Sequence, residues 1–579
     1  MFDTIIRNGT VVDGTGGEPY AADLGVRDGM IIAIGPTLGT DAGEVIDATG
    51  RIVTPGFVDI HTHFDGQVTW DAVLEPASNH GVTTVVTGNC GVGFAPVRPG
   101  AERDLIDLME GVEDIPGAAL VEGMEWRWES FPEYLDVLDQ RRWTVDVATQ
   151  LPHGPLRTYV MGRDGAENRQ ASSDQIAEME RLVRDAIEAG AFGFTSSRTL
   201  GHRALDGTPV PGTYAGEDEL TQIGRAVAAA GGGVLEFAPS GLAPRDRPDV
   251  VAEEFEWLGR LAAETGLPTS FILLQCHEAP ERWRAELEQA SRWRSRGARV
   301  TPLVAGRPFG VIWGWDVRHP FSARATYRSI AHLPLAQRLV ELRRADIRSR
   351  ILSELDEPHD RAEKGQLAYI RSVLGDCFVL TGIPDYEQPR EQSVGARAEA
   401  AGLSAEAITY DALVADDDAM LLYSLYNYAA GDHGVLHEQL EDPETVVGLN
   451  DGGAHCAFIC DASIPTFMLT HWARDRWRGP RVTVPEVVRR LTSQPADLYG
   501  LSDRGRLRIG HRADVNVINF DALNLGVPRA VHDLPAGGTR LLQSSRGYDV
   551  TMVAGTVTRR NGVDAGARPG RLLRAGAFI

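Results

Sequence analysis

The stretch Pro55-Gly56-Phe57-Val58-Asp59-Ile60-His61-Thr62-His63 decides how this chain is interpreted. A Pro-Gly turn comes first, a short apolar run follows, and two histidines stand at the carboxyl end of that run. Residues i and i+2 of a strand point to one face, so both imidazoles leave the predicted strand on the same side. Two imidazoles placed in this way can share one metal ion, most often zinc. Active sites of parallel barrels lie at the carboxyl ends of the strands. We therefore predict a metal site at His61 and His63 rather than a structural pair.

Outward from this strand, segments with strand character alternate with segments with helix character. The runs 82–86, 144–149 and 191–195 are predicted to be buried strands, and 173–189 has helical periodicity with a serine suited to the N-cap. Repeated alternation of this kind predicts an α/β fold in which a TIM-like (β/α)8 barrel occupies residues 55–504.

The two ends of the chain have a different pattern. Residues 1–54 contain apolar runs joined by tight turns, among them 5–14, where Asn8-Gly9 predicts the turn of a hairpin. Residues 505–579 also read as short strands and turns. We predict that both ends combine into one small β-sandwich domain, with the barrel inserted between them. An arginine- and glutamate-rich stretch at about 280–367 predicts an insertion over the barrel mouth.

The composition excludes several classes of partner. The formal net charge of −24 disfavours nucleic acid and anionic membranes, since both need a basic footprint. No run reaches the ~18 apolar residues that a membrane helix needs, and the N-terminal residues do not look like a signal peptide. The 5 cysteines are few, odd in number and scattered, which is typical of reduced thiols. We expect a cytoplasmic protein that acts on a small molecule, with a homo-oligomer left open.

Two further residues follow apolar runs in the same way. Cys90 stands in Thr87-Gly88-Asn89-Cys90-Gly91, where the glycines allow a sharp turn after a strand. Its thiolate would face the same mouth as His61, although a buried apolar role is equally open. Asp451 follows the run 446–450. An aspartate there can bind a metal and take a proton from its water, or it can form an Asp-Gly turn.

Together these residues resemble the amidohydrolase superfamily and, within it, the N-acyl-D-amino-acid deacylase (D-aminoacylase) family. The resemblance covers nearly the whole chain, which looks like a divergent member, and rests on segments 6–14, 55–63, 88–91 and 510–514. The element Gly88-Asn89-Cys90-Gly91 is the specific part, because that family uses a cysteine where its relatives use a carboxylated lysine. This fits a chain whose single lysine, Lys364, lies in a charged segment.

The resemblance implies a metal-dependent hydrolase with one or two zinc ions per chain. His61 and His63 would bind one zinc ion, and Cys90 would hold the more tightly bound ion or bridge two. Asp451 would be a metal ligand and the general base. The expected reaction is hydrolysis of the amide bond of an N-acyl amino acid, with a D configuration implied by the resemblance alone, or of a related small molecule.

The chain departs from the family pattern on two later strands, where the family carries one histidine each. The matching segments are 233–239, which contains Glu236, and 271–278, which contains His277. Either residue could replace a missing ligand, so the second metal position stays open.

Four more residues stand where a barrel mouth is expected. His153 and His202 are predicted as catalytic residues that orient the substrate, stabilise an oxyanion or bind metal, with hydrogen-bonded loop histidines as the alternative. Arg157 and Arg198 are predicted to pair with a substrate carboxylate, unless they are ordinary surface arginines.

Two other functions remain open at this point. The chain could be a cyclic-amide hydrolase that resembles hydantoinases, but the missing lysine bridge argues against this. It could also be a binding or regulatory protein built on an inactive barrel. The two missing histidines favour that alternative, and the retained metal-binding residues argue against it.

Overall fold

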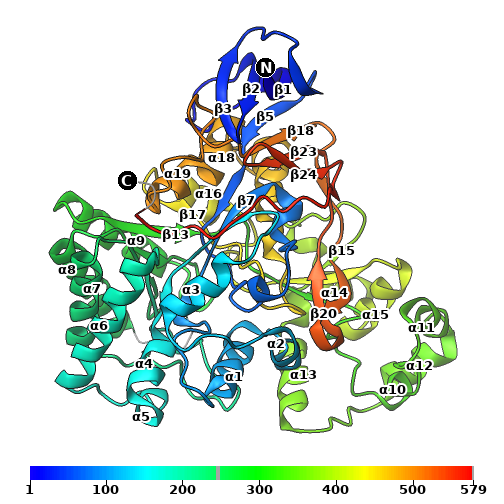
Figure 1. Ribbon diagram of the computed structural model, residues 1–579. Coiled ribbons are helices and arrows are strands. Elements are labelled where there is room, and N and C mark those ends of the chain that lie inside the picture. Colours follow the sequence, from blue (N-terminus) through cyan, green and yellow to red (C-terminus); the bar gives the residue numbers. More distant parts are fainter. Residues whose placement is uncertain (243–247, 577–579) are drawn as a thin grey trace.

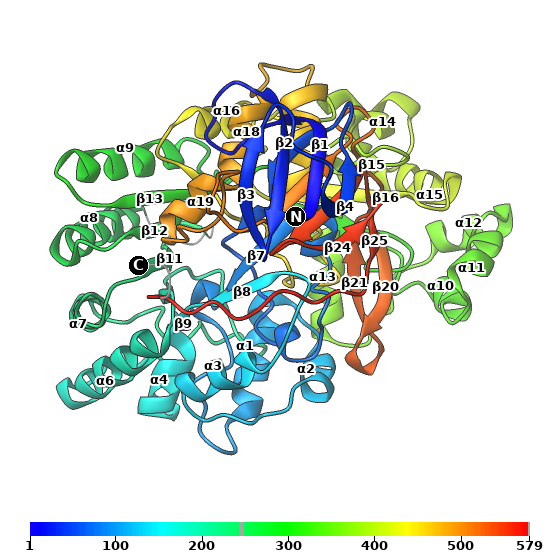
Figure 2. The ribbon, with the colours of Figure 1, turned by 45° about the horizontal axis from the view of Figure 1, so that its top comes forward.

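Both ends of the chain meet in one β-sheet. The structure is a computed structural model that describes residues 1–242 and 248–576. Nine strands form a sheet in the order β25-β24-β23-β18-β5-β1-β2-β3, with β4 beside β1 (Figure 1). Their bounds are β1 (Phe2–Val11), β2 (Tyr20–Arg27), β3 (Met30–Gly35), β4 (Ala42–Asp47), β5 (Ile52–Pro55), β18 (Val515–Ile518), β23 (Tyr548–Val553), β24 (Thr556–Arg560) and β25 (Val563–Asp564). Figure 2 shows the strands of the N-terminal part beside those of the C-terminal part.

The predicted hairpin at residues 5–14 is wrong. β1 runs through the Asn8-Gly9 pair as one strand, and its register with β2 shifts between Ile6 and Gly9. Asn8 adopts a left-handed φ of 59°, as at a β-bulge rather than a hairpin turn. A Cβ atom on Gly9 would lie 2.5 Å from Val53 Cγ2. At this bulge β1 thus approaches β5 so closely that only glycine fits.

The middle of the chain supplies parallel strands in two hydrogen-bonded groups. The first group is β6-β7-β8 and the second is β17-β13-β12-β11-β10-β9. Their bounds are β6 (Phe57–Asp59), β7 (Val82–Thr87), β8 (Asp146–Thr149), β9 (Leu151–Pro152), β10 (Gly193–Ser197), β11 (Val234–Ala238), β12 (Thr269–Ile272), β13 (Val300–Val304) and β17 (Val446–Val447). Gln150 alone separates β8 from β9, and an isolated parallel bridge joins Thr62, after β6, to Gly452, after β17.

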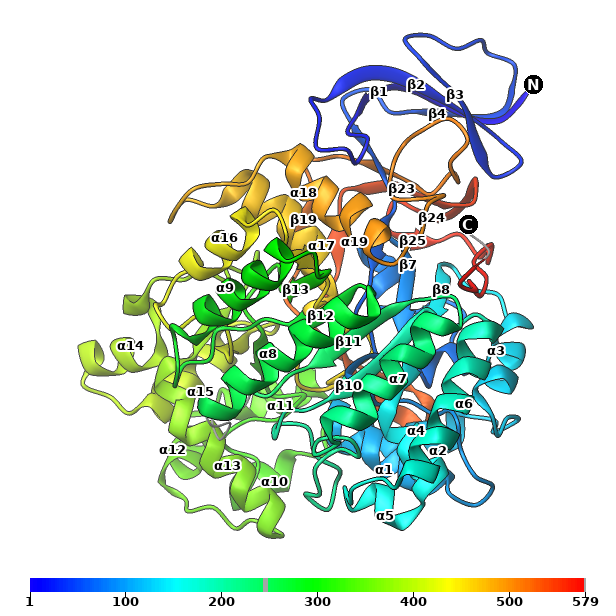
Figure 3. The ribbon, with the colours of Figure 1, turned by 90° about the vertical axis from the view of Figure 1, so that its left-hand side faces the viewer.

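Helices cover the second group of parallel strands on the outside. α6 (Ser173–Ala189), α7 (Glu217–Ala229), α8 (Pro248–Thr265) and α9 (Arg282–Ser295) pack against one another in chain order (Figure 3). The predicted helix at 173–189 has the bounds of α6. Its N-terminus is closed by a capping box between Ser172 and Gln175, which satisfies backbone N–H groups that otherwise lack partners.

A second body of helices interrupts the strand–helix alternation between β13 and β17. It contains the antiparallel sheet β14-β16-β15 and has a hydrophobic core of its own around Trp313 and Trp315. The bounds are β14 (Gly310–Trp313), α10 (Ala325–Ile330), α11 (Leu335–Leu342), α12 (Ala345–Ser353), α13 (Arg361–Val373), β15 (Phe378–Leu380), α14 (Val394–Ala401), α15 (Ala405–Ala415) and β16 (Met420–Ser424). The stretch predicted as an insertion, about 280–367, also takes in α9 and β13. These belong to the alternation, because β13 pairs with both β12 and β17.

Shorter elements complete the described chain. They are α1 (Glu102–Glu113), α2 (Gly117–Gly123), α3 (Phe131–Asp139), α4 (His153–Met161), α5 (Arg163–Ala166), α16 (Gly434–Glu441), α17 (Ile464–Phe467), the π-helical segment η7 (Met468–Asp475), α18 (Val484–Leu491), α19 (Ser493–Leu498), β19 (Asn524–Leu525), β20 (Arg529–Leu534), β21 (Gly538–Leu542) and β22 (Ser545–Arg546). In residues 1–242 and 248–576, no helix combines the length and apolar character needed to cross a membrane.

Candidate metal centre

His61 and His63 follow β6 at its carboxyl end, and both are buried. Backbone hydrogen bonds hold them from two sides: Thr62 N donates to Val86 O at 3.1 Å, and His63 N donates to Gly452 O at 2.8 Å. The two ring centroids are 5.3 Å apart in an edge-to-face arrangement. The backbone between two neighbouring strand ends therefore fixes both imidazoles toward one cavity.

Cys90 lies in the turn after β7. The turn needs left-handed backbone at Gly88, Cys90 and Gly91, with φ of 82°, 54° and 69°. A left-handed conformation is uncommon for cysteine, and such backbone persists where the surrounding structure enforces it. The enforcement is visible at Gly88, where a Cβ atom would lie 2.2 Å from Gln150 O. The turn brings Cys90 Sγ to 3.4 Å from His61 Nε2.

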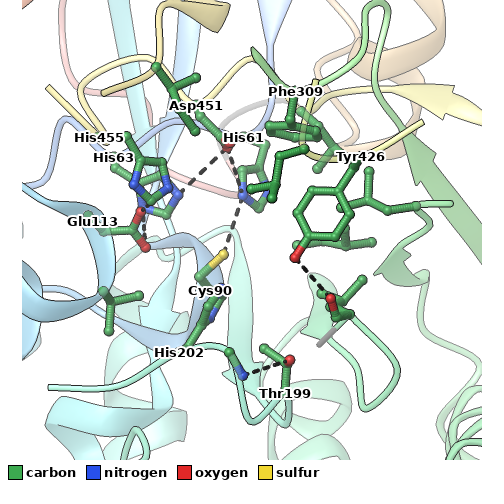
Figure 4. A pocket seen from close by; sticks show the side chains of 18 of the residues that line it. His61, His63, Cys90, Glu113, Thr199, His202, Phe309, Tyr426, Asp451 and His455 are labelled. Atoms are coloured by element: carbon green, nitrogen blue, oxygen red, sulfur yellow. Dashed lines mark hydrogen bonds and ion pairs between the residues drawn. The ribbon is translucent and has the colours of Figure 1, made fainter. Parts of the chain in front are cut away.

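Asp451 approaches the same point from the segment after β17. Its Oδ1 atom lies 3.5 Å from His61 Nε2 and 3.9 Å from His63 Nε2. Figure 4 shows these side chains and Cys90 directed toward one another. The ligand atoms of His61, His63 and Cys90 all lie within 4.8 Å of one another. Two imidazole nitrogens, one sulfur and one carboxylate oxygen around one point form a donor set that suits zinc.

The outward-facing nitrogens of both histidines meet carboxylates. Glu236, on β11, places Oε1 2.8 Å from His61 Nδ1, and its Oε2 accepts a hydrogen bond of 3.0 Å from the Tyr499 hydroxyl. Glu113, at the end of α1, places Oε1 3.4 Å from His63 Nδ1. Carboxylates on the far nitrogen orient metal-binding histidines and raise their basicity. Glu236 is thus an outer partner of His61, on the side away from Cys90 and Asp451.

The charges of this site call for a cation. Burial raises the pKa of the Cys90 thiol to about 12, despite the opposing effect of His61. Burial also raises the pKa of Asp451 and, together with Asp451, holds the pKa of Glu113 well above its ordinary value. Burial would lower the pKa of His61, yet Glu236 and Cys90 raise it well above its ordinary value. The acidic groups Glu236, Cys90 and Asp451 around His61 thus favour a bound cation among them, either a proton or a metal ion.

A cavity of about 240 Å³ opens over these groups (Figure 4). Its polar wall includes Glu113, His202 and His455 besides the residues above. Its remaining wall is largely apolar and contains Val112, Leu242, Ile272, Leu274, Phe309, Leu425, Leu449, Phe458 and Ile459. The cavity therefore combines polar groups that can carry chemistry with an apolar lining that suits an apolar group of a ligand.

Of the two predicted catalytic histidines, only His202 lines the cavity. Its Nδ1 lies 2.9 Å from Ser197 Oγ, and burial lowers the pKa of His202 to about 3, so the ring is neutral at pH 7. His153 is instead enclosed between Ser196 Oγ and Glu219 Oε1, each 2.8 Å away. The prediction of a catalytic His153 finds no support in this position, because both ring nitrogens already have partners.

The predicted carboxylate clamp is also not assembled. Arg157 is buried and forms an ion pair with Glu219, while Arg198 pairs with Glu254 at 3.0 Å and donates to Ala215 O at 2.6 Å. Among the residues that the structure describes, no arginine or lysine lines the cavity. Both guanidinium groups pair with carboxylates inside the protein. These ion pairs explain why arginines follow the strands without facing the cavity.

His277, considered as a replacement ligand, lies away from the cavity wall with its ring 6.3 Å from that of Tyr423. The cavity is lined instead by Ile272 and Leu274 from the same segment. Sequence reasoning missed Glu113, whose carboxylate lies 3.7 Å from His455 Nε2 at the cavity wall. Glu113 stands in no motif, and it ends a helix, whereas the predicted site residues follow strands.

Comparisons with known proteins agree with this geometry. A family model described as the amidohydrolase family matches residues 44–559. The chain is 27% identical over its whole length to N-acyl-D-glutamate deacylase of Alcaligenes xylosoxydans xylosoxydans, of which it covers 98%. It is 27% identical to D-aminoacylase of the same organism, over 90% of this chain and 88% of that one. Among solved structures, N-acyl-D-glutamate deacylase from Bordetella bronchiseptica, complexed with zinc and a phosphonate inhibitor, matches with a TM-score of 0.64 at 26% identity. That match covers 99% of this chain and 100% of the other.

Proposed function

This chain belongs to the amidohydrolase family, and we propose that it hydrolyses the amide bond of an N-acyl-D-amino acid at a zinc centre. The observation that carries the proposal is the convergence of His61 Nε2, His63 Nε2, Cys90 Sγ and Asp451 Oδ1 at the cavity. The D configuration and the choice of zinc rest on the relatives, namely the D-amino-acid deacylases and the zinc complex of one of them.

The proposed roles follow from the positions of the side chains. His61, His63, Cys90 and Asp451 would hold the metal, with Glu236 and Glu113 orienting the two imidazoles. A bound zinc ion would supply a water of lowered pKa and polarise the scissile carbonyl. Asp451 Oδ1 would accept the proton of the attacking water and pass it to the leaving amine. His202, neutral and held by Ser197, offers the substrate a polar contact at the cavity wall.

The apolar wall bears on the choice of substrate. The cavity of about 240 Å³ that holds the polar groups is also lined by Leu242, Ile272, Leu274 and Phe309. Burying methylene groups there stabilises the complex by roughly 0.8 kcal/mol each. An apolar acyl chain or amino-acid side chain fits this wall better than the acidic side chain of D-glutamate.

We extend the proposal to the architecture. Eight strand positions, with β8 and β9 sharing one, would close into a (β/α)8 barrel. Support comes from Phe192 N, which donates to Thr149 O at 2.9 Å across one junction, and from the Thr62–Gly452 bridge across the other. Residues 55–504 would form the barrel with its inserted helices, and 1–54 with 505–579 the β domain.

The test is a substrate panel with purified protein and added zinc. We expect amine release from N-acetyl-D-methionine and N-acetyl-D-leucine, with much slower release from their L enantiomers and from N-acetyl-D-glutamate. Hydantoin belongs in the same panel, because its hydrolysis in place of the open-chain amides would favour a cyclic-amide hydrolase. A protein that binds zinc but cleaves no amide would contradict the proposal and favour a binding protein.

A thiol mechanism without metal is the second candidate. Cys90 Sγ, His61 and Glu236 Oε1 stand in the order nucleophile, base and orienting carboxylate, with contacts of 3.4 and 2.8 Å. The raised pKa of Cys90 argues against it, since the thiol stays protonated. Full activity after exhaustive chelation, abolished by iodoacetamide, would favour this candidate over the zinc centre.

A further inference from the structure

A second cluster of metal-binding side chains lies apart from the cavity of the first. Glu387 follows β15, His433 directly precedes α16, and His471 stands on the π-helical segment η7. Glu387 and His433 are 2% and 0% exposed, and His471 is 12% exposed. Three segments separated by some 40 residues each in the chain thus bring two imidazoles and one carboxylate together inside the protein.

The distances among these groups have the size that a tetrahedral metal site requires. His433 Nδ1 lies 3.1 Å from His471 Nε2 and 3.6 Å from Glu387 Oε2, and the latter two atoms are 3.0 Å apart. Ligands at about 2.0–2.1 Å from a tetrahedral zinc ion are about 3.3 Å from one another. The three atoms therefore already form one face of such a tetrahedron.

The hydrogen bonds set the form of each ligand. His433 Nε2 lies 3.1 Å from Tyr386 O, and since a carbonyl only accepts, this nitrogen carries the proton. His433 Nδ1 is then a lone-pair donor directed at the cluster. Glu387 Oε1 and Oε2 accept hydrogen bonds from Arg476, whose guanidinium can only donate, so the carboxylate meets the cluster as an acceptor.

Aromatic side chains pack against both imidazole rings, and a cavity borders His471. Phe467 stacks on His471 at 4.6 Å, and Trp472 contacts both histidines at 5.3 and 5.8 Å. His471 also lines a cavity of about 230 Å³, bordered by Tyr386, Thr470 and the exposed Trp477. Of the three residues only His471 lines this cavity, so an ion would reach the cluster past His471.

We propose that Glu387, His433 and His471 form a second site for a divalent transition-metal ion of the zinc class, separate from the centre at His61. The ligands would be Glu387 Oε2, His433 Nδ1 and His471 Nε2, with the fourth position facing the cavity. Because the site joins the loop before α14, the start of α16 and η7, a bound ion would stabilise this side of the protein.

Arg476 is the feature that opposes the proposal. Its Nε and Nη2 atoms each lie 3.1 Å from the Glu387 carboxylate, so a positive charge stands beside the site already. The guanidinium orients the carboxylate as an outer partner does, and Oε2 keeps a lone pair that now accepts the His471 proton. A metal ion would replace that proton. We expect an affinity weaker than that of a structural zinc site.

The experiment measures metal binding to the full-length protein without the first centre. His63→Ala and Cys90→Ala are combined, the protein is stripped with chelator, and Zn²⁺ and then Co²⁺ are titrated. We expect one ion per chain, and with Co²⁺ the visible absorption of a tetrahedral site without a thiolate charge-transfer band. Adding His471→Ala should weaken binding at least about 100-fold, more than the loss of an outer partner does. His437→Ala, one turn further along α16, should leave it unchanged.

The outcomes separate this proposal from the hydrolytic one. If the doubly substituted protein binds no ion, or if His471→Ala leaves its binding unchanged, the second site does not exist. Should His471→Ala fail to fold, Glu387→Gln tests the same ligand set with a side chain of equal size. Amide hydrolysis by the wild-type protein does not enter either result, so the two proposals stand or fall independently.

Discussion

Glu236 Oε1 lies 2.8 Å from His61 Nδ1, and both side chains are 1% exposed. This carboxylate stands in the segment 233–239, where the resemblance to the deacylase family implies a histidine. A carboxylate at this distance can accept the Nδ1 proton of His61, and the lone pair is then on Nε2, which lies 3.4 Å from Cys90 Sγ. Substituting Glu236 should therefore change how tightly the whole centre binds a metal ion.

Glu236→Gln should weaken zinc binding by about 10–100-fold and lower kcat/KM with it. The amide can present its NH2 group to Nδ1, which favours the tautomer that carries a proton on Nε2 and cannot bind metal. Competition with a chromophoric chelator measures the affinity. Tyr499→Phe, which removes the hydrogen bond to Glu236 Oε2 but leaves the carboxylate beside His61, is the control and should have a smaller effect. Equal affinity in Glu236→Gln and wild type would show that this pair does not orient the ligand.

Cys90→Ala should lose one metal ion per chain relative to the wild type. The thiolate is the softest donor of the set, and its pKa, raised to about 12 by burial, requires a cation beside it for ionisation. Elemental mass spectrometry of purified protein gives the count. Cys377→Ala, another buried cysteine but in the second hydrophobic core, should keep the wild-type metal content. Unchanged metal in Cys90→Ala would remove the cysteine from the ligand set.

Asp451→Asn should lower kcat by about 10²–10⁴-fold while the protein remains folded. An amide keeps the size and one oxygen of the side chain but cannot accept the proton of the attacking water. Steady-state kinetics on the best substrate of the panel, with circular dichroism as a folding check, measure the effect. Asp104→Asn, on the exposed face of α1, is the control. Wild-type turnover in Asp451→Asn would rule out the general-base role.

The sequence was sufficient where a signal is local. The strand at 82–86 and the helix at 173–189 were predicted within one residue, because hydrophobic period and an N-cap serine are written in adjacent residues. The pair His61 and His63 was predicted for a similar reason, since both follow an apolar run. For Cys90 and Asp451 the same position left a structural role open, and the family resemblance added the expectation that they join the two histidines.

The sequence was insufficient where a partner is distant. Glu113 meets His63 from a helix end 50 residues further on, and nothing near Glu113 indicates this. Arg157 and Arg198 looked available to a substrate because their carboxylate partners, Glu219 and Glu254, lie more than 50 residues away. The Asn8-Gly9 pair has the composition of a hairpin turn, and only pairing with strands on both sides makes it a bulge.

Arg504→Met should destabilise the protein by about 3–5 kcal/mol. Arg504 is 1% exposed, and its Nη1 atom lies 2.7 Å from Asp146 Oδ2 on β8, which is fully buried. Removing the guanidinium leaves a buried carboxylate that Arg512 alone must neutralise. The shift of the urea midpoint reports the loss. Arg506→Met breaks only the exposed pair with Asp497 and should cost less than about 1 kcal/mol. Similar urea midpoints for the two variants would show that the buried pair contributes no more to stability than the exposed pair.

Glu286→Gln should make stability less dependent on pH between about 5 and 8. Burial raises the pKa of Glu286 to about 8, although Arg282, with Nε 3.4 Å away, opposes the shift. In the unfolded chain the same group titrates near 4.3, at about the ordinary pKa of glutamate. Between these values the folded state binds more protons than the unfolded state, so this residue lowers stability as pH rises.

Glutamine does not titrate, so the variant does not lose stability in this way. Relative to wild type, the variant should therefore gain roughly 3–4 kcal/mol between pH 5 and pH 8, since one pKa unit corresponds to about 1.4 kcal/mol. Urea midpoints of both proteins at the two pH values give this difference, in which titrations common to both cancel. Parallel changes in the two proteins would mean that Glu286 titrates in the fold as it does in water.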